Sequence, residues 1–236
     1  MTSLGNEFFA SLVFKIINGL ADSVVRQCNI LVLASGPDEA LARAEGLGVV
    51  RSSDSEKFLG VQELLSIDGK IQDGVELVWR EETWAEGDLK KFIEENVINK
   101  ALAGNTDLSP VGWYVGEITL LEVGEGGDKE QDLLIWRNTY LLEEPSGQVA
   151  FQRLESMGQQ EQDAGGHTSD GQNATWRFLG VSMLTPVEEL PADGSLLWCE
   201  HLDSSPTQMM LNMPSRDELG VFRWLSESVE ISKAKR

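Results

Sequence analysis

The feature of the sequence that most constrains the fold is an internal duplication. The tetrapeptide FLGV at Phe58 recurs 120 residues later, at Phe178. At this offset, the 24 positions from Phe58 to Glu81 contain eight identities without a gap, and these include the dipeptides Asp-Gly at Asp73 and Asp193. Self-similarity at a fixed offset is typical of chains built from repeated structural units. The sequence therefore predicts two copies of one module.

The duplication extends on both sides of this segment. At an offset of 110 residues, Ala40, Arg43, Glu45 and Gly48 match Ala150, Arg153, Glu155 and Gly158. The change of offset from 110 to 120 means that the second copy has ten additional residues, in a polar segment at about 158–175. Such a segment is expected to form a surface loop. The predicted organisation is a first repeat at 1–103, a linker at 104–111 and a second repeat at 112–236.

Each copy is predicted to fold in the order ββαββα, which belongs to the α+β class. Hydrophobic patterning and turn residues place the elements. The expected strands span 8–20, 29–34, 57–67 and 75–83 in the first copy, and 113–123, 132–142, 177–187 and 195–202 in the second. The closing helices are expected at 88–98 and 216–228. We expect antiparallel sheets with the helices packed on one face.

The central helix of each copy has recognisable start and stop signals. Ser35 is a candidate N-cap, and Pro37 suits the first turn of a helix. An apolar stripe follows in both copies, which is typical of a helix with one face on the core. Gly48 and Gly158 are predicted to end the two helices.

The charge of the chain excludes several classes of function. The chain has 236 residues, with 19 basic and 39 acidic residues, and its formal net charge is −20. Such a charge opposes binding to the phosphates of nucleic acids and to anionic membrane surfaces. No apolar run approaches the about 18 residues of a membrane span, and no signal peptide is recognised. We expect a cytoplasmic protein whose partner, if it is a protein, is basic.

The two cysteines, Cys28 and Cys199, are too few for a framework of disulfides. A free cysteine is commonly a small buried hydrophobic residue. We therefore expect each of them to be packed in the interior rather than to act as a reactive thiol.

Some motifs resemble those of a known family. An alanine-rich helix ending in Leu47-Gly48, followed by FLGV at Phe58 and Asp-Gly-Val-Glu-Leu at Asp73, is similar to a small bacterial family classed as a domain of unknown function. The second copy departs from the last motif, with Ser195-Leu196 in place of Val-Glu. The resemblance covers nearly the whole chain as two tandem copies. It implies a fold and a bacterial origin, with no activity attached.

The sequence offers little catalytic chemistry. It has no P-loop, dinucleotide-binding, metalloprotease or nucleophile-elbow motif. One of the two histidines, His167, lies in the polar insertion. Cys199, Glu200 and His201 form the one local cluster of potential metal or acid–base groups, but a zinc site needs more convergent ligands than this strand offers. We expect no catalytic residue, no metal and no cofactor, so an enzyme is the less favoured interpretation.

The tryptophans are more informative. Five of the seven lie in the second copy. Strand alternation places Trp79 on the face of Val75 and Leu77, which predicts a core residue. Trp198 is one residue out of phase with Trp79, so it is either packed internally or exposed at an interface. The candidate binding residues are Trp198, Glu200, His201, Asp203, Glu81, Glu82 and Trp84.

Two functions from different classes remain open. The favoured hypothesis is a non-catalytic, acidic protein-interaction module, of the kind that immunity and inhibitor proteins represent. The alternative is a small-ligand-binding protein or enzyme with a cleft between the two repeats. A nucleic-acid mimic ranks last, since the acids show no regular spacing. A tandem repeat can build a pseudo-twofold axis internally, so we expect a monomer.

Overall fold

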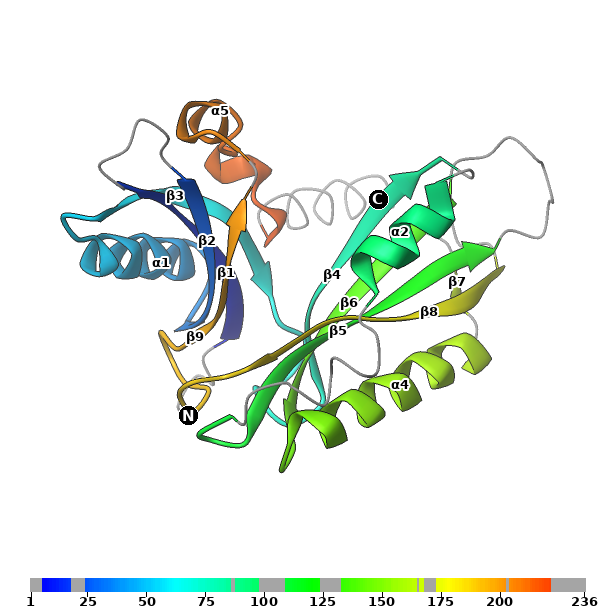
Figure 1. Cartoon of the computed structure of the whole chain (residues 1–236). Coiled ribbons are helices and arrows are strands. Elements are labelled where there is room, and N and C mark those ends of the chain that lie inside the picture. Colours follow the sequence, from blue (N-terminus) through cyan, green and yellow to red (C-terminus); the bar gives the residue numbers. More distant parts are fainter. Residues whose placement is uncertain are drawn as a thin grey trace, which may run out of the picture. The chain divides into compact units, whose positions relative to one another are not determined.

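The computed structural model describes residues 6–17, 24–85, 88–97, 109–123, 133–164, 166–167, 173–202 and 204–221. The chain divides into two compact units (Figure 1). Unit 1 combines Met1–Ile71 with Glu189–Arg236, and unit 2 is Gln72–Glu188. Each unit is an antiparallel sheet with a few helices, which confirms the α+β class.

Unit 1 contains a sheet with the strand order β3-β1-β2-β9. Its strands are β1 (Asn6–Ile16), β2 (Val24–Ala34), β3 (Glu56–Ser66) and β9 (Leu196–Leu202). Its helices are α1 (Pro37–Arg51), α5 (Pro206–Leu211) and the 3-10 turn η2 (Arg216–Glu218). The expected strands of the first copy are thus present up to β3. The expected helix at 216–228 is described only up to residue 221, and the described part is η2, a bend at Leu219 and the two helical residues Gly220 and Val221.

Unit 2 contains a sheet with the strand order β4-β6-β5-β8-β7. Its strands are β4 (Val75–Trp84), β5 (Trp113–Val123), β6 (Leu133–Glu143), β7 (Gly166–His167) and β8 (Asn173–Pro186). Its helices are α2 (Leu89–Asn96) and α4 (Gly147–Ala164). The polar insertion of the second copy lengthens the end of α4, forms β7 and lengthens the start of β8.

The fourth strand of each sheet comes from the other copy of the sequence. β4 follows β3 in the first copy, yet it pairs with β6 of the second copy. β9 follows β8 in the second copy, yet it pairs with β2 of the first copy. β3 forms one edge of its sheet, and the segment 67–74 carries the chain from this edge into β4 of the other sheet. The compact units therefore cross the boundaries of the sequence repeats.

A repeated ion pair fixes the start of each exchanged strand. Asp193, before β9, bonds Arg43 of α1 and accepts a hydrogen bond from the Leu33 amide at 2.9 Å. Its counterpart Asp73, before β4, accepts hydrogen bonds from Arg153 of α4 at 2.7 Å and from the Glu143 amide at 2.9 Å.

Asp73 illustrates the electrostatics of these ion pairs. Partial burial alone would raise the pKa of its carboxyl group, but the hydrogen bonds from Arg153 and the Glu143 amide outweigh burial and hold the pKa below its usual value. The repeated Asp-Gly motif therefore does more than form a turn. It anchors a strand of one copy to the helix of the other.

The pairing registers show which residues of the two units correspond. Phe8 pairs with Val32 and Ser66, and Tyr114 pairs with Leu142 and Pro186 in the equivalent way. The two register shifts along β1 recur at the equivalent places along β5. Phe8 and Tyr114 are therefore equivalent, and the remaining correspondences follow from the same registers.

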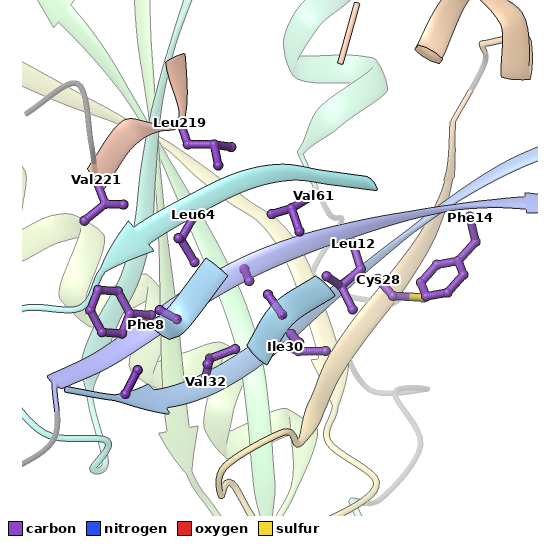
Figure 2. Packing of buried hydrophobic residues seen from close by; sticks show 14 residues of the cluster. Phe8, Leu12, Phe14, Cys28, Ile30, Val32, Val61, Leu64, Leu219 and Val221 are labelled. Atoms are coloured by element: carbon purple, nitrogen blue, oxygen red, sulfur yellow. The ribbon is translucent and has the colours of Figure 1, made fainter. Parts of the chain in front are cut away.

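Each unit has apolar packing on both faces of its sheet. In unit 1, alternate residues of β1 and β2 pack against α1 (Figure 2). The opposite face of β1 and β2 packs against Met209 of α5. In unit 2, α4 covers the face of Ile118 and Leu120, whereas Phe92 of α2 packs against Leu121 on the other face. Helices on both faces differ from the expected packing on one face.

Gly48 and Gly158 do not end their helices. α1 continues to Arg51 and α4 to Ala164. Both glycines are buried, and a Cβ at either position would lie well inside van der Waals contact with the ring of Phe58 or Phe178. The repeated glycine and the repeated Phe of FLGV are thus explained together, because the missing side chain lets the ring lie against the helix. The predicted stop signal is wrong for this reason.

We expect Gly158→Ala and Gly46→Ala to have opposite effects on stability. Gly46 lies in α1, and no other atom lies within 4 Å of the place where a methyl group would be, so alanine should raise the free energy of unfolding by roughly 0.5–1 kcal/mol. At Gly158 the added methyl group would overlap the packed Phe178 ring. This overpacking should lower the free energy of unfolding by roughly 1–3 kcal/mol. Urea unfolding of both variants measures the difference. A stabilised Gly158→Ala variant would contradict the role assigned to this glycine.

Within the described parts of the chain, no helix combines the length and the apolar character needed to cross a membrane.

Candidate functional site

One face of unit 2 carries a pocket of about 230 Å³ with three indole rings in its wall. The pocket lies on the side of the sheet that α4 covers. Its lining residues are Glu76, Trp79, Leu120, Trp136, Asn138, Glu161 and Trp176. Two of these residues are acidic, and none of the described residues that line the pocket is basic. The pocket is therefore aromatic and negatively charged.

A β-bulge places Trp79 in this pocket. The register between β4 and β6 shifts between Glu76 and Val78, so Leu77 and Val78 are both buried. An extra residue in a strand reverses the facing of the residues that follow it. Trp79 consequently lies opposite Asn138 and is 55% exposed. The prediction that Trp79 is a core residue is wrong, because simple alternation from Val75 does not continue through the bulge.

Trp136 is the central ring of the three. Its ring centroid lies 5.1 Å from that of Trp79, with an angle of 34° between the planes. It lies 5.5 Å from that of Trp176 in an edge-to-face arrangement of 78°. Its Nε1 donates a hydrogen bond to Glu122 Oε2 at 3.2 Å. This bond occupies the indole N–H, so Trp136 offers the pocket ring surface and no hydrogen-bond donor.

Tyr140 lies beside the two pocket carboxylates. Burial raises the pKa of its hydroxyl group far above the usual value, and the charges of Glu76 and Glu161 raise it further. The neutral hydroxyl is hydrogen-bonded to Glu76 and accepts a hydrogen bond from Asn138 Nδ2 at 3.5 Å. Tyr140 therefore adds no charge to the pocket, and it holds the Glu76 side chain in place.

Unit 1 shows that the fold does not require these indoles. The positions of Trp136 and Trp176 correspond to Arg26 and Glu56, which form an ion pair at 2.6 Å. The same backbone arrangement is thus built in unit 1 without an aromatic pair. Trp136 and Trp176 pack part of their surface against the core of unit 2, but unit 1 builds the same backbone arrangement without them.

The charges of the pocket are also particular to unit 2. Glu76 corresponds to Leu196, because Glu76 pairs with Tyr140 and Leu196 pairs with the equivalent residue, Ile30. Glu161 of α4 corresponds to Arg51 of α1, which donates a hydrogen bond to the Gly194 carbonyl at 2.8 Å. Two carboxylates therefore stand in unit 2 where unit 1 has an apolar residue and a cation. Unit 2 alone combines ring surface with negative charge at this place.

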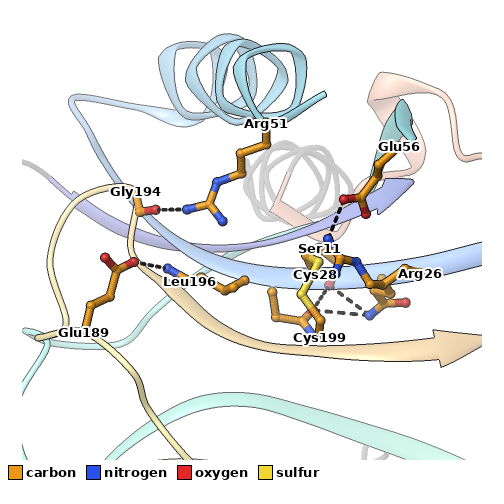
Figure 3. Close-up of a disulfide and its surroundings, with 11 residues drawn as sticks. Ser11, Arg26, Cys28, Arg51, Glu56, Glu189, Gly194, Leu196 and Cys199 are labelled. Carbon is orange, nitrogen blue, oxygen red and sulfur yellow. Dashed lines mark hydrogen bonds and ion pairs between the residues drawn. A yellow bond between two sulfur atoms is a disulfide. The ribbon is translucent and has the colours of Figure 1, made fainter. Parts of the chain in front are cut away.

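The third pair of equivalent positions is a disulfide in unit 1. Trp79 and Asn138 correspond to Cys199 and Cys28, which face each other across β9 and β2 with their Cα atoms 4.2 Å apart (Figure 3). The expectation of two separate buried thiols is therefore wrong. The sequence could not indicate this pairing, because it depends on the exchange of β9 into the first sheet.

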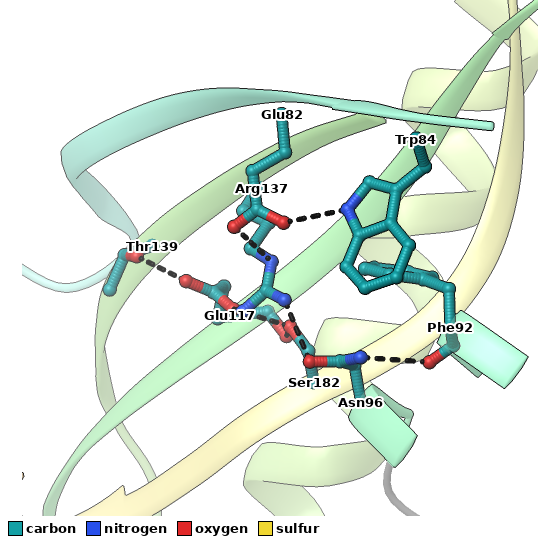
Figure 4. Close-up of polar contacts among 8 residues, drawn as sticks. All are labelled: Glu82, Trp84, Phe92, Asn96, Glu117, Arg137, Thr139 and Ser182. Carbon is teal, nitrogen blue, oxygen red and sulfur yellow. Dashed lines mark hydrogen bonds and ion pairs between the residues drawn. The ribbon is translucent and has the colours of Figure 1, made fainter. Parts of the chain in front are cut away.

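Two of the residues proposed from the sequence have structural contacts on the other face of unit 2. Trp84 Nε1 donates to Glu82 Oε2 at 3.1 Å, and Glu82 Oε1 lies 3.2 Å from Arg137 Nε (Figure 4). The Trp84 ring also packs edge-on against Phe92 of α2 at 5.0 Å. These contacts hold α2 on the sheet.

Arg137 is the centre of this polar network. Its guanidinium group lies over the Phe92 ring, donates to Asn96 Oδ1 at 2.9 Å and reaches Glu117 at 3.5 Å (Figure 4). The buried Glu117 also accepts a hydrogen bond from Ser182 at 2.6 Å. A buried carboxylate is costly unless it is paired, so Arg137 compensates the charge of Glu117. The polar groups of this cluster therefore bond to one another.

The other candidate residues are distributed over both units. Glu81 is exposed and lies opposite Trp136 in the register, on the face of the pocket. Trp198 is buried, with its ring centroid 5.6 Å from that of Phe9. Glu200 and the exposed His201 lie on β9 in unit 1. Asp203 lies outside the described residues. Sequence reasoning thus reached one residue of the pocket face, Glu81, and missed the group that forms the pocket.

In the described residues, we find no group of three or more His, Cys, Asp or Glu side chains placed to bind a metal ion. The fold and the pocket define an α+β protein of two units with exchanged fourth strands and one acidic, aromatic pocket. Comparison with protein-family models, curated proteins and solved structures gives no match. The resemblance to a bacterial domain of unknown function therefore stays a prediction.

Proposed function

We propose that the protein is a non-catalytic binding module for a basic protein, and that the pocket of unit 2 receives a cationic side chain of this partner. The observation that supports the proposal is the combination of Trp79, Trp136 and Trp176 with Glu76 and Glu161 in one pocket. The immunity- or inhibitor-like role, a bacterial origin and a monomeric state belong to the same proposal, whereas the Cys28–Cys199 disulfide, of a kind that is rare in the cytosol, argues against a cytoplasmic location. A small-ligand site between the repeats stays the alternative.

The chemistry of the pocket favours a cation in two ways. The face of an indole ring attracts a positive charge, and such a contact contributes about 0.5–2 kcal/mol depending on desolvation. Carboxylates at the wall add Coulomb attraction at short range. The net charge of −20 acts at longer range, since it accelerates encounters with a positively charged partner at low ionic strength.

We expect a lysine-rich peptide to bind the full chain at low salt, and a glutamate-rich peptide of the same length not to bind. Isothermal titration calorimetry measures both, and tryptophan fluorescence reports whether the indoles respond. Raising the salt concentration should weaken binding, because exposed charges are screened over about 10 Å at 0.1 M ionic strength.

A matched pair of variants locates the binding site. Glu161→Gln removes one charge from the pocket wall, and Glu188→Gln removes one exposed charge outside it. The first variant should weaken binding of the lysine-rich peptide several-fold, and the second should change it only slightly. Equal effects of the two variants would show that general acidity, and not the pocket, attracts the peptide. Absence of binding at low salt would overturn the proposed function.

A further inference from the structure

The structure also points to the kind of cation that the pocket prefers. We propose that the pocket binds a quaternary ammonium group, such as a trimethylammonium group. This inference rests on the proposed function, because it assumes that a cation enters the pocket, and it narrows the chemistry of that cation. Such a group occurs on free choline-like molecules and on trimethylated lysine side chains, and the experiment below distinguishes the two sources.

The first argument is the supply of hydrogen-bond partners. A primary ammonium group has three N–H donors, all of which need acceptors when the group leaves water. Most of the pocket wall is ring surface, which accepts no ordinary hydrogen bond, and among the described lining residues its acceptors are limited to the carboxylates of Glu76 and Glu161 and the buried Oδ1 of Asn138. A quaternary ammonium group has no N–H donor, so it enters the same pocket without leaving a donor unsatisfied.

The second argument is the match of surfaces. The methyl groups of a quaternary ammonium carry most of its surface and part of its charge, so they need apolar walls of negative potential. Three indoles and Leu120 provide such walls, with neighbouring ring centroids 5.1 and 5.5 Å apart. Recognition of quaternary ammonium groups by several aromatic rings is a known use of cation–π contacts.

The third argument is the kind of charge that the pocket offers. Glu76 and Glu161 compensate a cation through Coulomb attraction, which does not require a hydrogen bond. The guanidinium group of arginine, by contrast, needs planar, bidentate acceptors. Trp79 is the most exposed of the three rings and therefore forms the accessible side of the pocket. A pocket of about 230 Å³ has room for a trimethylammonium group together with water.

The test compares three small probes on the full chain by calorimetry. Choline carries the trimethylammonium group, ethanolamine carries a primary ammonium group on the same scaffold, and 3,3-dimethyl-1-butanol is the neutral isostere of choline. We expect choline to bind about tenfold or more tightly than either of the other two, in line with the strength of a desolvated cation–π contact. Equal binding of choline and its neutral isostere, or tighter binding of ethanolamine, would overturn the proposal.

Variants then assign the effect to the pocket. Trp79→Ala removes an exposed ring and should reduce choline binding about fivefold or more, by loss of one cation–π contact. Leu190→Ala removes an exposed apolar side chain of unit 1 and should leave choline binding unchanged. Circular dichroism confirms that both variants are folded. If Trp79→Ala binds choline as the parent chain does, the indole pocket is not the site.

The source of the group follows from a second comparison. A trimethyllysine peptide that binds more than about tenfold tighter than choline indicates a protein source, since the flanking residues then add contacts. Equal affinities indicate that the free group suffices. If an unmethylated lysine-rich peptide binds but choline does not, the proposed function stands and this inference is wrong. If neither binds, both are wrong.

Discussion

Neither sequence repeat is expected to fold alone. A chain of residues 1–103 contains β1, β2, α1 and β3, but it lacks β9, which completes the edge of β2 in the full protein. Its own β4 lacks β6, the strand with which it pairs. The core of unit 1 would also lose Leu196, Leu219 and Val221, which come from the second copy. We expect this fragment to show no cooperative unfolding transition as a monomer.

The size of this effect follows from the balance of folding energies. A domain of this size is stable by only about 5–15 kcal/mol, whereas each fully buried aliphatic side chain contributes about 1.5–3 kcal/mol. Loss of β9 removes several such side chains and exposes a row of unpaired backbone groups along β2. The fragment 112–236 suffers the equivalent loss, since β6 would lack β4.

A cut chain provides the matched control. Residues 1–103 and 112–236 produced together contain every strand of both sheets, so we expect them to form a stable complex that unfolds cooperatively. Circular dichroism and urea titration compare this complex with each fragment. A monomeric 1–103 fragment with a cooperative transition would contradict the exchange of fourth strands. A dimer of that fragment would be compatible with it, because two copies could exchange β4 with each other.

Sequence patterns predicted the positions of the principal strands but could not predict their pairing. The eight principal strands lie close to their expected ranges, since alternation and turn residues are local signals. The exchange of β4 and β9 leaves no such signal. Both copies carry the same anchoring pair, with Asp73 and Asp193 as the acids and Arg43 and Arg153 as the bases. Each acid therefore suits either base, and composition does not distinguish the two connections.

The candidate site could not be predicted from the sequence for a related reason. Its tryptophans come from β4, β6 and β8, which belong to one sheet only because β4 pairs with β6. The bulge after Glu76 then turns Trp79 outward, against the alternation that predicted a core position. Trp198 was the out-of-phase residue in the sequence, and it packs on Phe9 in the interior. Alternation along a strand therefore does not identify a partner site by itself, because the pairing of the strands must also be known.

Opening the disulfide between Cys28 and Cys199 is expected to destabilise unit 1 strongly. The two residues are 171 positions apart in the sequence, so the cross-link closes a very long loop in the unfolded chain. In the chain-entropy account, a loop of this length contributes about 5 kcal/mol to stability. The cross-link also joins the exchanged β9 directly to β2, at the edge where the second copy completes the first sheet. Reduction should therefore act first on this edge.

The measurement compares urea unfolding of the oxidised and the reduced chain with that of a Cys28→Ala/Cys199→Ala double variant. We expect the reduced chain and the double variant to unfold at similar, much lower urea concentrations than the oxidised chain. Fluorescence of Trp198, which packs on Phe9 beside the cross-link, should change in the same transition, and a Trp198→Phe control identifies its share of the signal. Equal stability of the oxidised and reduced chains would show that the cross-link does not restrain the exchanged strand. In that case, the Asp193 anchor and the apolar contacts of β9 would suffice to hold it.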